Sequence, residues 1–290
     1  MSHFAGRDGN DSFGARPQMN QLVRGVGRLI EVLDEVTSTN DAARERALAG
    51  ASHGTAVRAR VQTAGRGQRG HGWASPAGGL YLSIVLRPQV PQYLMTGLPA
   101  ACGIGAARAL EGVGASGVRI KWPNDLVVGG AKLGGMLTEA GWAAGGVFAV
   151  CGVGINEAAP QVEGDSPRAL PVTGLDACMG GDLPVPSLDA LAEAVRSGIV
   201  SAVDEWAAAV ARAGAAAIPL AGIMDEFYDR LAYMGEYVAL IDRDGRPYAA
   251  GILTGVDAWG RALVRVDGGP GAEAAERAFD PAQVSIRPLS

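Results

Sequence analysis

Glycine and arginine residues alternate in one short stretch of the chain, residues 61–79 (VQTAGRGQRGHGWASPAGG). Glycine has no side chain to bury and loses much backbone entropy on folding, so packing does not explain so many of them. They do let backbone N–H groups approach a ligand closely, and Arg66 and Arg69 supply permanently charged, forked donors that suit an anion. The stretch therefore predicts a loop that wraps a phosphate-bearing ligand.

A second set of candidate residues lies between positions 121 and 135. In the segment KWPND, Asn124 and Asp125 are common turn residues, which favours an ordinary hairpin. An aspartate beside an anion-binding loop can also hold a metal ion or steer an amine, so both interpretations of Asp125 stay open. Lys132 precedes two glycines inside an expected strand, where glycine often marks the close approach of a ligand. A lone lysine, however, is usually a solvated charge.

Ser38, Thr39 and Asn40 stand immediately before an expected helix. Ser38 followed by Asp41 resembles a capping box, and a simple helix N-cap is the favoured interpretation. A helix N-terminus can also offer unbonded N–H groups to a ligand. These residues therefore remain candidates for binding as well as for capping.

Several familiar functional motifs are absent from the sequence. The glycine–arginine stretch lacks the G-K-[ST] ending of a phosphate-binding P-loop, and residues 151–156 (CGVGIN) do not form a dinucleotide fingerprint that opens a helix. None of the 3 histidines pairs with a cysteine at metal-ligand spacing, so no zinc site is expected. The 3 cysteines are widely spaced and odd in number, which indicates reduced thiols in a cytosol.

The segments that position these residues alternate between strands and helices. Apolar alternation predicts strands, and a helical period ended by Gly or Pro predicts helices. We expect strands at 28–36, 57–61, 81–86, 117–122, 126–128, 132–140 and 147–155. We expect helices at 40–49, 97–111, 187–213 and 219–233, and a proline-rich surface loop at 158–187. The pattern indicates the α+β class, with a mixed or antiparallel sheet and helices.

The composition changes near residue 235. Short alternating stretches at 237–241, 248–254, 262–266 and 283–286 are separated by glycine turns, which predicts a small five-stranded β-barrel. At the other end, polar residues without a period predict a flexible tail. We therefore expect a tail at 1–20, a main domain at 21–234 and a barrel domain at 235–290.

Composition limits the classes of partner. Hydrophobic residues make up 48% of the 290 residues, enough for a sizeable core, and the net charge of −5 gives bulk nucleic-acid binding no electrostatic support. No apolar run approaches the ~18 residues of a membrane span, and the N-terminus does not have the pattern of a signal peptide. A cytoplasmic protein without a nucleic-acid or membrane partner is expected.

Five motifs, taken together and in order, resemble those of the biotin protein ligase family. They are STN (38–40), QTAGRG (62–67), KWPNDL (121–126), KLGG (132–135) and GVGIN (152–156). The resemblance covers roughly residues 30 to 290, and the expected barrel stands where that family has an SH3-like domain. Because no N-terminal DNA-binding domain is expected, the resemblance is to the monofunctional type of ligase.

This resemblance implies a class II synthetase-like catalytic domain and an activity. An enzyme of this family makes biotinyl-5′-AMP from biotin and ATP and transfers biotin to a lysine of a biotin carboxyl carrier protein, which belongs to acetyl-CoA carboxylase or a related carboxylase. The resemblance also implies Mg²⁺ that arrives with ATP, and a cytoplasmic monomer or weak homodimer.

The family motifs further imply a role for each matching residue. Catalytic roles fall to Lys132, Arg66 and Asp125. Contacts with biotin are implied for Ser38, Thr39, Asn40, Gln62, Arg66, Gly67, Gln68, Lys132, Gly135 and Gly152. Contacts with ATP or the adenylate are implied for Gly65, Arg66, Gly67, Gln68, Arg69, Lys121, Asn124 and Asn156. The metal ligand is left open, with Asp125 as a candidate, and Trp73 either covers the ligand or, as favoured here, belongs to the core.

The sequence departs from the family pattern at two positions, since Gln68 and His71 stand where the family often has arginine. A lipoate ligase of the same fold is the main alternative enzyme, although KWPND and the barrel speak against it. A non-catalytic biotin sensor is an alternative of a different class. An RNA-binding module is set aside because the chain is acidic.

Overall fold

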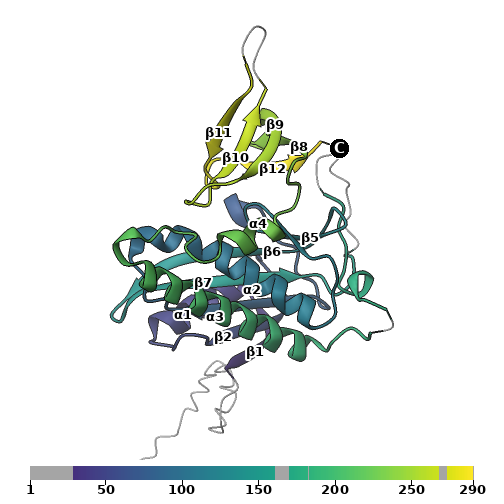
Figure 1. Ribbon diagram of the computed structural model, residues 1–290. Helices are drawn as coiled ribbons and strands as arrows, with labels where there is room; N and C mark the ends of the chain where they lie inside the picture. Colours follow the sequence, from purple (N-terminus) through teal and green to yellow (C-terminus); the bar gives the residue numbers. More distant parts are fainter. Residues whose placement is uncertain (1–28, 161–169, 182, 268–272, 290) are drawn as a thin grey trace, which may run out of the picture.

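The computed structural model describes residues 29–160, 170–181, 183–267 and 273–289, so the expected tail at 1–20 lies outside the described residues. Within these ranges the chain forms two β-sheets (Figure 1). The larger sheet has the order β1-β2-β3-β7-β6-β5-β4. Its strands are β1 (Ile30–Val36), β2 (Ala56–Gln62), β3 (Leu80–Leu86), β4 (Arg119–Lys121), β5 (Asp125–Val128), β6 (Ala131–Ala143) and β7 (Gly146–Ile155). Only β1 and β2 pair in parallel, which confirms a mixed sheet with an antiparallel meander.

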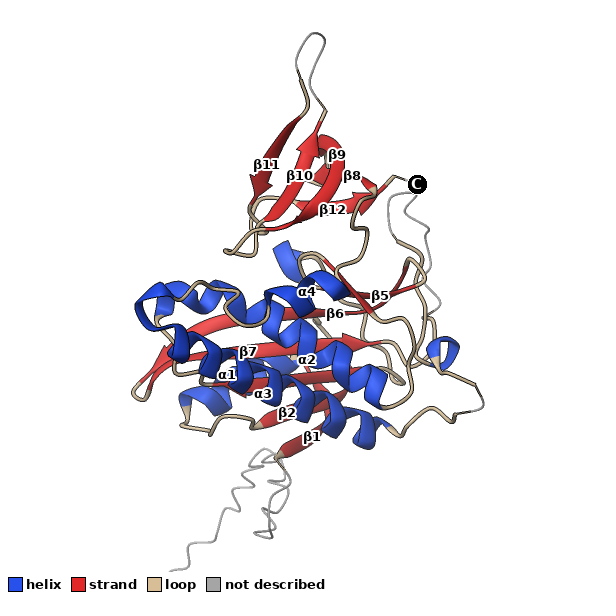
Figure 2. Ribbon diagram, in the orientation of Figure 1, coloured by secondary structure: helices blue, strands red, loops and turns tan. Residues whose placement is uncertain are grey.

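The helices pack on both faces of this sheet. They are α1 (Thr39–Leu48), α2 (Leu98–Gly112), α3 (Leu188–Ala213) and α4 (Met224–Arg230). Neighbouring residues of a strand point to opposite faces, so Val85 packs with α1 whereas Ile84 joins the core under α2 and α3. Figure 2 shows α2 and α3 lying side by side across the sheet.

Small residues bring α2 and α3 together. A Cβ atom on Gly105 would lie 2.5 Å from the Gly198 carbonyl oxygen, and one on Gly198 would lie 2.6 Å from the Gly105 carbonyl oxygen. The buried, small-residue helix expected at 97–111 is thus confirmed, and its glycines serve helix packing.

The smaller sheet is antiparallel, with the order β11-β10-β9-β8-β12. Its strands are β8 (Tyr237–Ile241), β9 (Pro247–Val256), β10 (Ala262–Val266), β11 (Ala275–Phe279) and β12 (Ser285–Pro288). The expectation of five strands in this region is confirmed. Strand β11 was not located from the sequence, because four of its five residues are exposed and show no apolar alternation.

The two sheets share one hydrophobic core, which continues from Phe227 and Leu231 into Val238 of β8. Hydrogen bonds reinforce the junction. The indole N–H of Trp122 donates to the carbonyl of Gly260 at 2.9 Å, and the hydroxyl of Tyr228 donates to the carbonyl of Val256 at 2.6 Å. The turn between β4 and β5, which the KWPND segment forms, is therefore the part of the larger sheet that contacts the smaller sheet's region.

Two expectations for the connecting segments need correction. Residues 170–181 are not simply a surface loop, because the backbone around Thr173 pairs with Lys132 and because Leu175 and Cys178 are buried. The helix expected at 219–233 is shorter, since only α4 is an α-helix. Gly222, at φ +72°, adopts a left-handed conformation just before it.

Candidate active site

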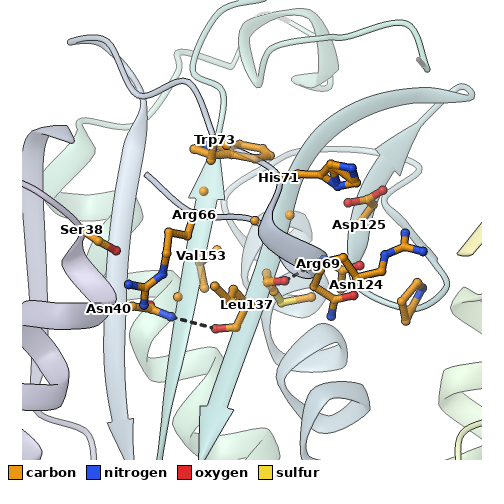
Figure 3. Close-up of a pocket in the computed structure, with 18 of the residues that line it drawn as sticks. Ser38, Asn40, Arg66, Arg69, His71, Trp73, Asn124, Asp125, Leu137 and Val153 are labelled. Atoms are coloured by element: carbon orange, nitrogen blue, oxygen red, sulfur yellow. Dashed lines mark hydrogen bonds between the residues drawn. The ribbon is translucent and has the colours of Figure 1, made fainter. Parts of the chain in front are cut away.

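One cavity of about 170 Å³ collects nearly all of the predicted site residues. It is bounded by the start of α1, the glycine–arginine loop, the β4–β5 turn, and β6 and β7. Figure 3 shows Ser38 and Asn40 on one side of the cavity and Arg69, Asn124 and Asp125 on the other. Every residue with an implied role lines this cavity except Gly65 and Asn156.

Gly65 and Asn156 lie outside the cavity lining and hold its walls, and their implied contacts with ATP stay a prediction. A Cβ atom on Gly65 would lie 2.5 Å from the carbonyl oxygen of Trp73, so glycine here lets the loop close on itself. The Asn156 amide donates to the carbonyl of Thr173 at 3.2 Å and fastens residues 170–181 to the sheet. The sequence motif marked both residues, but not their direction.

The N-terminus of α1 is capped from another strand. Ser38 occupies the N-cap position, yet its side chain makes no capping hydrogen bond to any residue that the structure describes, so the expected capping box is wrong. Gln62 replaces it, since its Oε1 accepts from the backbone N–H of Thr39 at 2.8 Å and from the Thr39 hydroxyl at 3.0 Å. Ser38 is therefore a cavity residue rather than a cap.

Ser83 is a buried serine that the sequence analysis did not identify, and it fixes the side chain of Asn40. The Ser83 hydroxyl is fully buried, 2.8 Å from the Thr39 hydroxyl and 2.6 Å from Asn40 Oδ1. The Asn40 amide nitrogen in turn donates to Glu139 at 2.7 Å. A serine in the otherwise apolar strand LYLSIVL was the available signal, because a buried hydroxyl needs a partner.

The position of Gly152 leads to a testable prediction about this side of the cavity. A Cβ atom there would overlap Oδ1 of Asn40 and push its amide out of the network with Ser83. The resemblance places biotin against Gly152, and on that expectation Gly152→Ala should weaken biotin binding at least about tenfold, the effect of losing one well-placed hydrogen bond. Isothermal titration with biotin measures this. The matched control is Gly112→Ala at the end of α2, where a Cβ atom meets nothing within 4 Å, and equal affinities for the two variants would contradict the prediction.

Two lysines share one carboxylate on the opposite side of the cavity. Nζ of Lys121 lies 2.6 Å from Oδ2 of Asp125, and Nζ of Lys132 lies 2.8 Å from its Oδ1. Strand pairing explains the arrangement, because Lys121 is the register partner of Asp125 across β4 and β5. The carboxylate draws the Lys121 side chain into the interior, where Lys121 is only 7% exposed.

Burial and neighbouring charges shift the pKa values of Asp125 and Lys121 in opposite directions. Burial alone would raise the pKa of Asp125, but the two ammonium groups outweigh it and hold that pKa below its usual value. Burial lowers the pKa of Lys121, and the attraction of Asp125 offsets this only in part. Asp125 is therefore an ionised hydrogen-bond acceptor and a weak base.

Trp73 lines the cavity, so its assignment to the core is wrong. Its ring centroid lies 5.1 Å from Nζ of Lys132, within the range of a cation–π contact. A Cβ atom on Gly154 would lie 2.6 Å from the ring, and one on Gly135 would lie 3.4 Å from it. The glycines of β6 and β7 thus make room for the indole as well as for a ligand.

Arg66 is held by two acidic residues, Asp41, which the sequence analysis considered only for the capping box, and Glu139, which it did not single out. Its guanidinium lies 2.7 Å from Asp41 and 2.9 Å from Glu139, and its pKa is raised, chiefly by the hydrogen bond to Asp41. The expected cradle of loop N–H groups is present only in part, because the N–H of Gly67 already donates to the carbonyl of His71.

The smaller sheet contributes to the site as well. Ser285 at the start of β12 lines the cavity, and Nη1 of Arg69 lies 3.5 Å from the carbonyl oxygen of Ile241 in β8. Arg69 adopts a left-handed conformation at φ +57°, and burial lowers its pKa. More than 200 positions separate Ser285 from the glycine–arginine loop, so no local sequence signal could have found this contact.

The cavity has the hydrogen-bonding residues of α1 and β2 at one end and the Lys121–Asp125–Lys132 cluster at the other, an arrangement that suits a small polar molecule joined to an anion. The model of the Biotin/lipoate A/B protein ligase family matches residues 32–156. A biotin–[acetyl-CoA-carboxylase] ligase of Paracoccus denitrificans is 35% identical over 239 residues, which cover 81% of this chain and 93% of that protein. The chain belongs to the biotin protein ligase family.

Solved structures are similar over most of the chain. The biotin protein ligase of Aquifex aeolicus, in complex with biotin and ATP, has 26% identity and a TM-score of 0.65, and the match covers 89% of this chain and 98% of that one. The ligase of Leishmania major, in complex with biotinyl-5-AMP, has 27% identity and a TM-score of 0.55, with 86% and 98% covered. Both matches extend well beyond the segment that the family model covers.

Proposed function

We propose that this chain is an ATP-dependent ligase that makes biotinyl-5′-AMP from biotin and ATP and then transfers biotin to a lysine of a biotin carboxyl carrier protein. The observation that carries the proposal is the single cavity in which the hydrogen-bonding residues of α1 face the Lys121–Asp125–Lys132 cluster. The names of the similar ligase from Paracoccus denitrificans and of the structures with biotin and ATP or biotinyl-5-AMP support it.

The polar end of the cavity suits the uncharged ring of biotin. Ser38, Thr39, Asn40 and Gln62 present hydroxyl and amide groups that can hydrogen-bond a ureido group, and the side chains of Thr39, Asn40 and Gln62 are fixed by hydrogen bonds to neighbouring residues. Gly152 leaves room for the ring against the sheet. Preorganised donors and acceptors of this kind cost little entropy on binding.

The charged end suits the reaction centre. A carboxylate is a poor acyl donor until it is joined to AMP, and the joining step builds negative charge on phosphorus oxygens. Lys132 and Arg66 would stabilise that charge, with Gln68 and the backbone around Gly67 beside them. The half-closed cavity would keep the mixed anhydride from water.

Asp125 would orient the amine of the incoming carrier lysine. Such an amine has an unperturbed pKa of about 10.4 and arrives mostly protonated at neutral pH. The ionised carboxylate can accept a hydrogen bond from this amine, and the low pKa of Asp125 favours orientation over deprotonation, so the amine gives up its proton to solvent before it attacks. Lys121 and Asn124 are proposed to serve the ATP phosphates. Since Lys121 already pairs with Asp125 and the Asn124 amide donates to Met136 at 2.7 Å, both act from fixed positions.

The described residues do not fit a protein-made magnesium site. Among them, no group of three His, Cys, Asp or Glu side chains could hold a metal ion. Both oxygens of Asp125 are engaged by lysines, which makes it a poor ligand. We propose Mg²⁺ only as the companion of ATP, and no step of the mechanism depends on it.

The proposed setting is the cytoplasm, and the proposed partner is the carrier domain of acetyl-CoA carboxylase or a related carboxylase. Cys102, Cys151 and Cys178 are all free and buried, as suits a reducing compartment. In the part of the chain that the structure describes, no helix has the length and apolarity needed to cross a membrane.

Pyrophosphate release from Mg-ATP tests the proposed function. The reaction is run with biotin and with lipoate, each with and without an apo carrier domain. Release that stalls near one equivalent with biotin alone and resumes when carrier is added is the expected result. Activity with lipoate alone would move the chain to the sister class of ligase, and bound biotin without turnover would indicate a sensor.

The position of Gln68 leads to a prediction about how long the enzyme retains biotinyl-AMP. It lines the cavity at a position where the resemblance suggests arginine, so the loop has lost one charge-assisted hydrogen bond. We expect Gln68→Arg to slow the release of biotinyl-AMP by about tenfold. Release of radiolabelled adenylate in a filter assay measures the rate, with the exposed Gln89→Arg as the control. Equal release from wild type and Gln68→Arg would refute the prediction.

A further inference from the structure

Lysine is scarce in this chain and is confined to one place. Of its 25 lysine and arginine residues, only Lys121 and Lys132 are lysines. Both line the cavity, and both pair with the same carboxylate, Asp125. The guanidinium group of arginine stays protonated in proteins, so the other basic side chains offer no nucleophilic amine.

The inference rests on the proposed function, under which the reaction intermediate can acylate a lysine of the cavity. Biotinyl-AMP is an acylating agent for lysine amines, and Lys132 would lie next to its activated carboxyl group. Groups held in contact react with effective concentrations of about 10⁵ M or more when their geometry is right. A neutral amine at Lys132 would therefore compete with the carrier lysine.

We infer that Asp125 protects the two cavity lysines from acylation by the enzyme's own intermediate, because each of its carboxylate oxygens holds one lysine Nζ in an ion pair. An ammonium group has no lone pair and cannot attack a carbonyl carbon. The ion pairs of 2.6 Å and 2.8 Å place one carboxylate oxygen on each lysine Nζ, so Asp125 alone contacts both amines. The same charges remain available to bind phosphate oxygens.

The reaction that Asp125 prevents can be written in full. A neutral Nζ attacks the carbonyl carbon of biotinyl-AMP, and a C–N amide bond forms. The bond between that carbon and the phosphate oxygen breaks, its electron pair leaves with AMP, and the amine proton passes to solvent. The product is an enzyme with biotin fixed in its own cavity and one cation lost.

Lys132 is the more vulnerable of the two lysines. Its side chain is 28% exposed, whereas that of Lys121 is 9% exposed and lies against the sheet junction. Trp73 contacts Lys132 through its ring face, which favours a cation but cannot accept a proton. Without Asp125, the ammonium form of Lys132 loses its closest anionic partner among the described residues.

Intact-mass analysis of Asp125→Asn tests this inference. The variant and the wild type are incubated with chemically made biotinyl-AMP, without carrier, at concentrations that saturate each protein as measured by titration. We expect the variant to gain one biotinyl group at Lys132, mapped by peptide mass spectrometry, while the wild type stays unmodified. At least a tenfold difference in adduct fraction is expected. Supplying the adenylate ready-made removes any dependence on the adenylation step.

Three further variants make the outcome unambiguous. Asp34→Asn changes a carboxylate that is 94% exposed and lies outside the cavity, and it should stay unmodified. Asp125→Glu should restore protection. In Asp125→Asn combined with Arg60→Lys, an adduct at position 60 equal to that at Lys132 would show non-specific labelling and overturn the inference.

Two other results would also overturn it. They are an adduct on Lys132 of the wild type and a saturated Asp125→Asn protein without any adduct. If the wild type does not bind biotinyl-AMP at all, the proposed function fails first, and the inference fails with it.

Discussion

Replacing Lys132 by alanine is expected to lower the rate of biotinyl-AMP formation at least about a hundredfold, the cost of removing one preorganised donor from a charge-stabilising site. Lys132 is the more accessible of the two cavity lysines, and it stands between Asp125 and the face of Trp73. Biotin itself should still bind, because the ring end of the cavity is built by other residues from α1 and β2.

A pyrophosphate-release assay with biotin and Mg-ATP measures the effect of Lys132→Ala. Arg60→Ala is the control, since this surface arginine is 67% exposed, lies outside the cavity and, among the described residues, pairs with Asp34. Lys132→Arg should recover part of the rate because it keeps the charge. A full adenylation rate in Lys132→Ala would show that the residue has no part in the chemistry.

Replacing Asp125 by alanine is expected to impair two properties together. Transfer of biotin to the carrier should fall more than adenylation does, because the amine loses the acceptor that orients it. Stability should fall by about 3–5 kcal/mol, since Lys121 is left buried without its ion-pair partner. Single-turnover transfer and urea unfolding measure these effects separately. Unchanged transfer would remove Asp125 from the proposed mechanism.

The stability effect of Asp125 should depend on pH in a defined direction. Its pKa in the folded protein is depressed, so it contributes stability that is fully present above the ordinary carboxyl pKa of about 3.9. That contribution is lost as the pH falls through the lower, folded value. The difference in unfolding free energy between wild type and Asp125→Ala should therefore shrink as the pH falls below about 4. A difference that grows toward acid would contradict the ion-pair arrangement.

Much of the fold could be predicted from local sequence, for physical reasons. Strands such as β3 and β7 are continuous apolar runs, and α3 has a regular apolar stripe. Turn glycines with positive φ, such as Gly130 and Gly146, mark the ends of the meander strands. Strand β11 could not be predicted, because its exposed residues show no apolar alternation. The pairing of residues 170–181 with Lys132 could not be predicted either, because it joins segments that are far apart in the chain.

For the candidate site, too, some features could be predicted from the sequence and others could not. Motif residues could be named from the sequence because glycine, arginine and lysine at those spacings are unusual. Their directions could not be named, as Gly65, Asn156 and Trp73 show. Direction depends on which strands become neighbours, and a strand's register is set by the whole sheet rather than by its own residues.

The sequence by itself determined most of the strands and helices, the motif residues and the confinement of lysine to positions 121 and 132. Only the tertiary structure decided that Gln62 caps α1, that Ser83 fixes Asn40, and that Ser285 reaches the cavity. It also decided that both lysines meet one carboxylate. The physical reason is that composition and periodicity are local properties, whereas a hydrogen bond or an ion pair in a site needs two segments that the fold alone brings together.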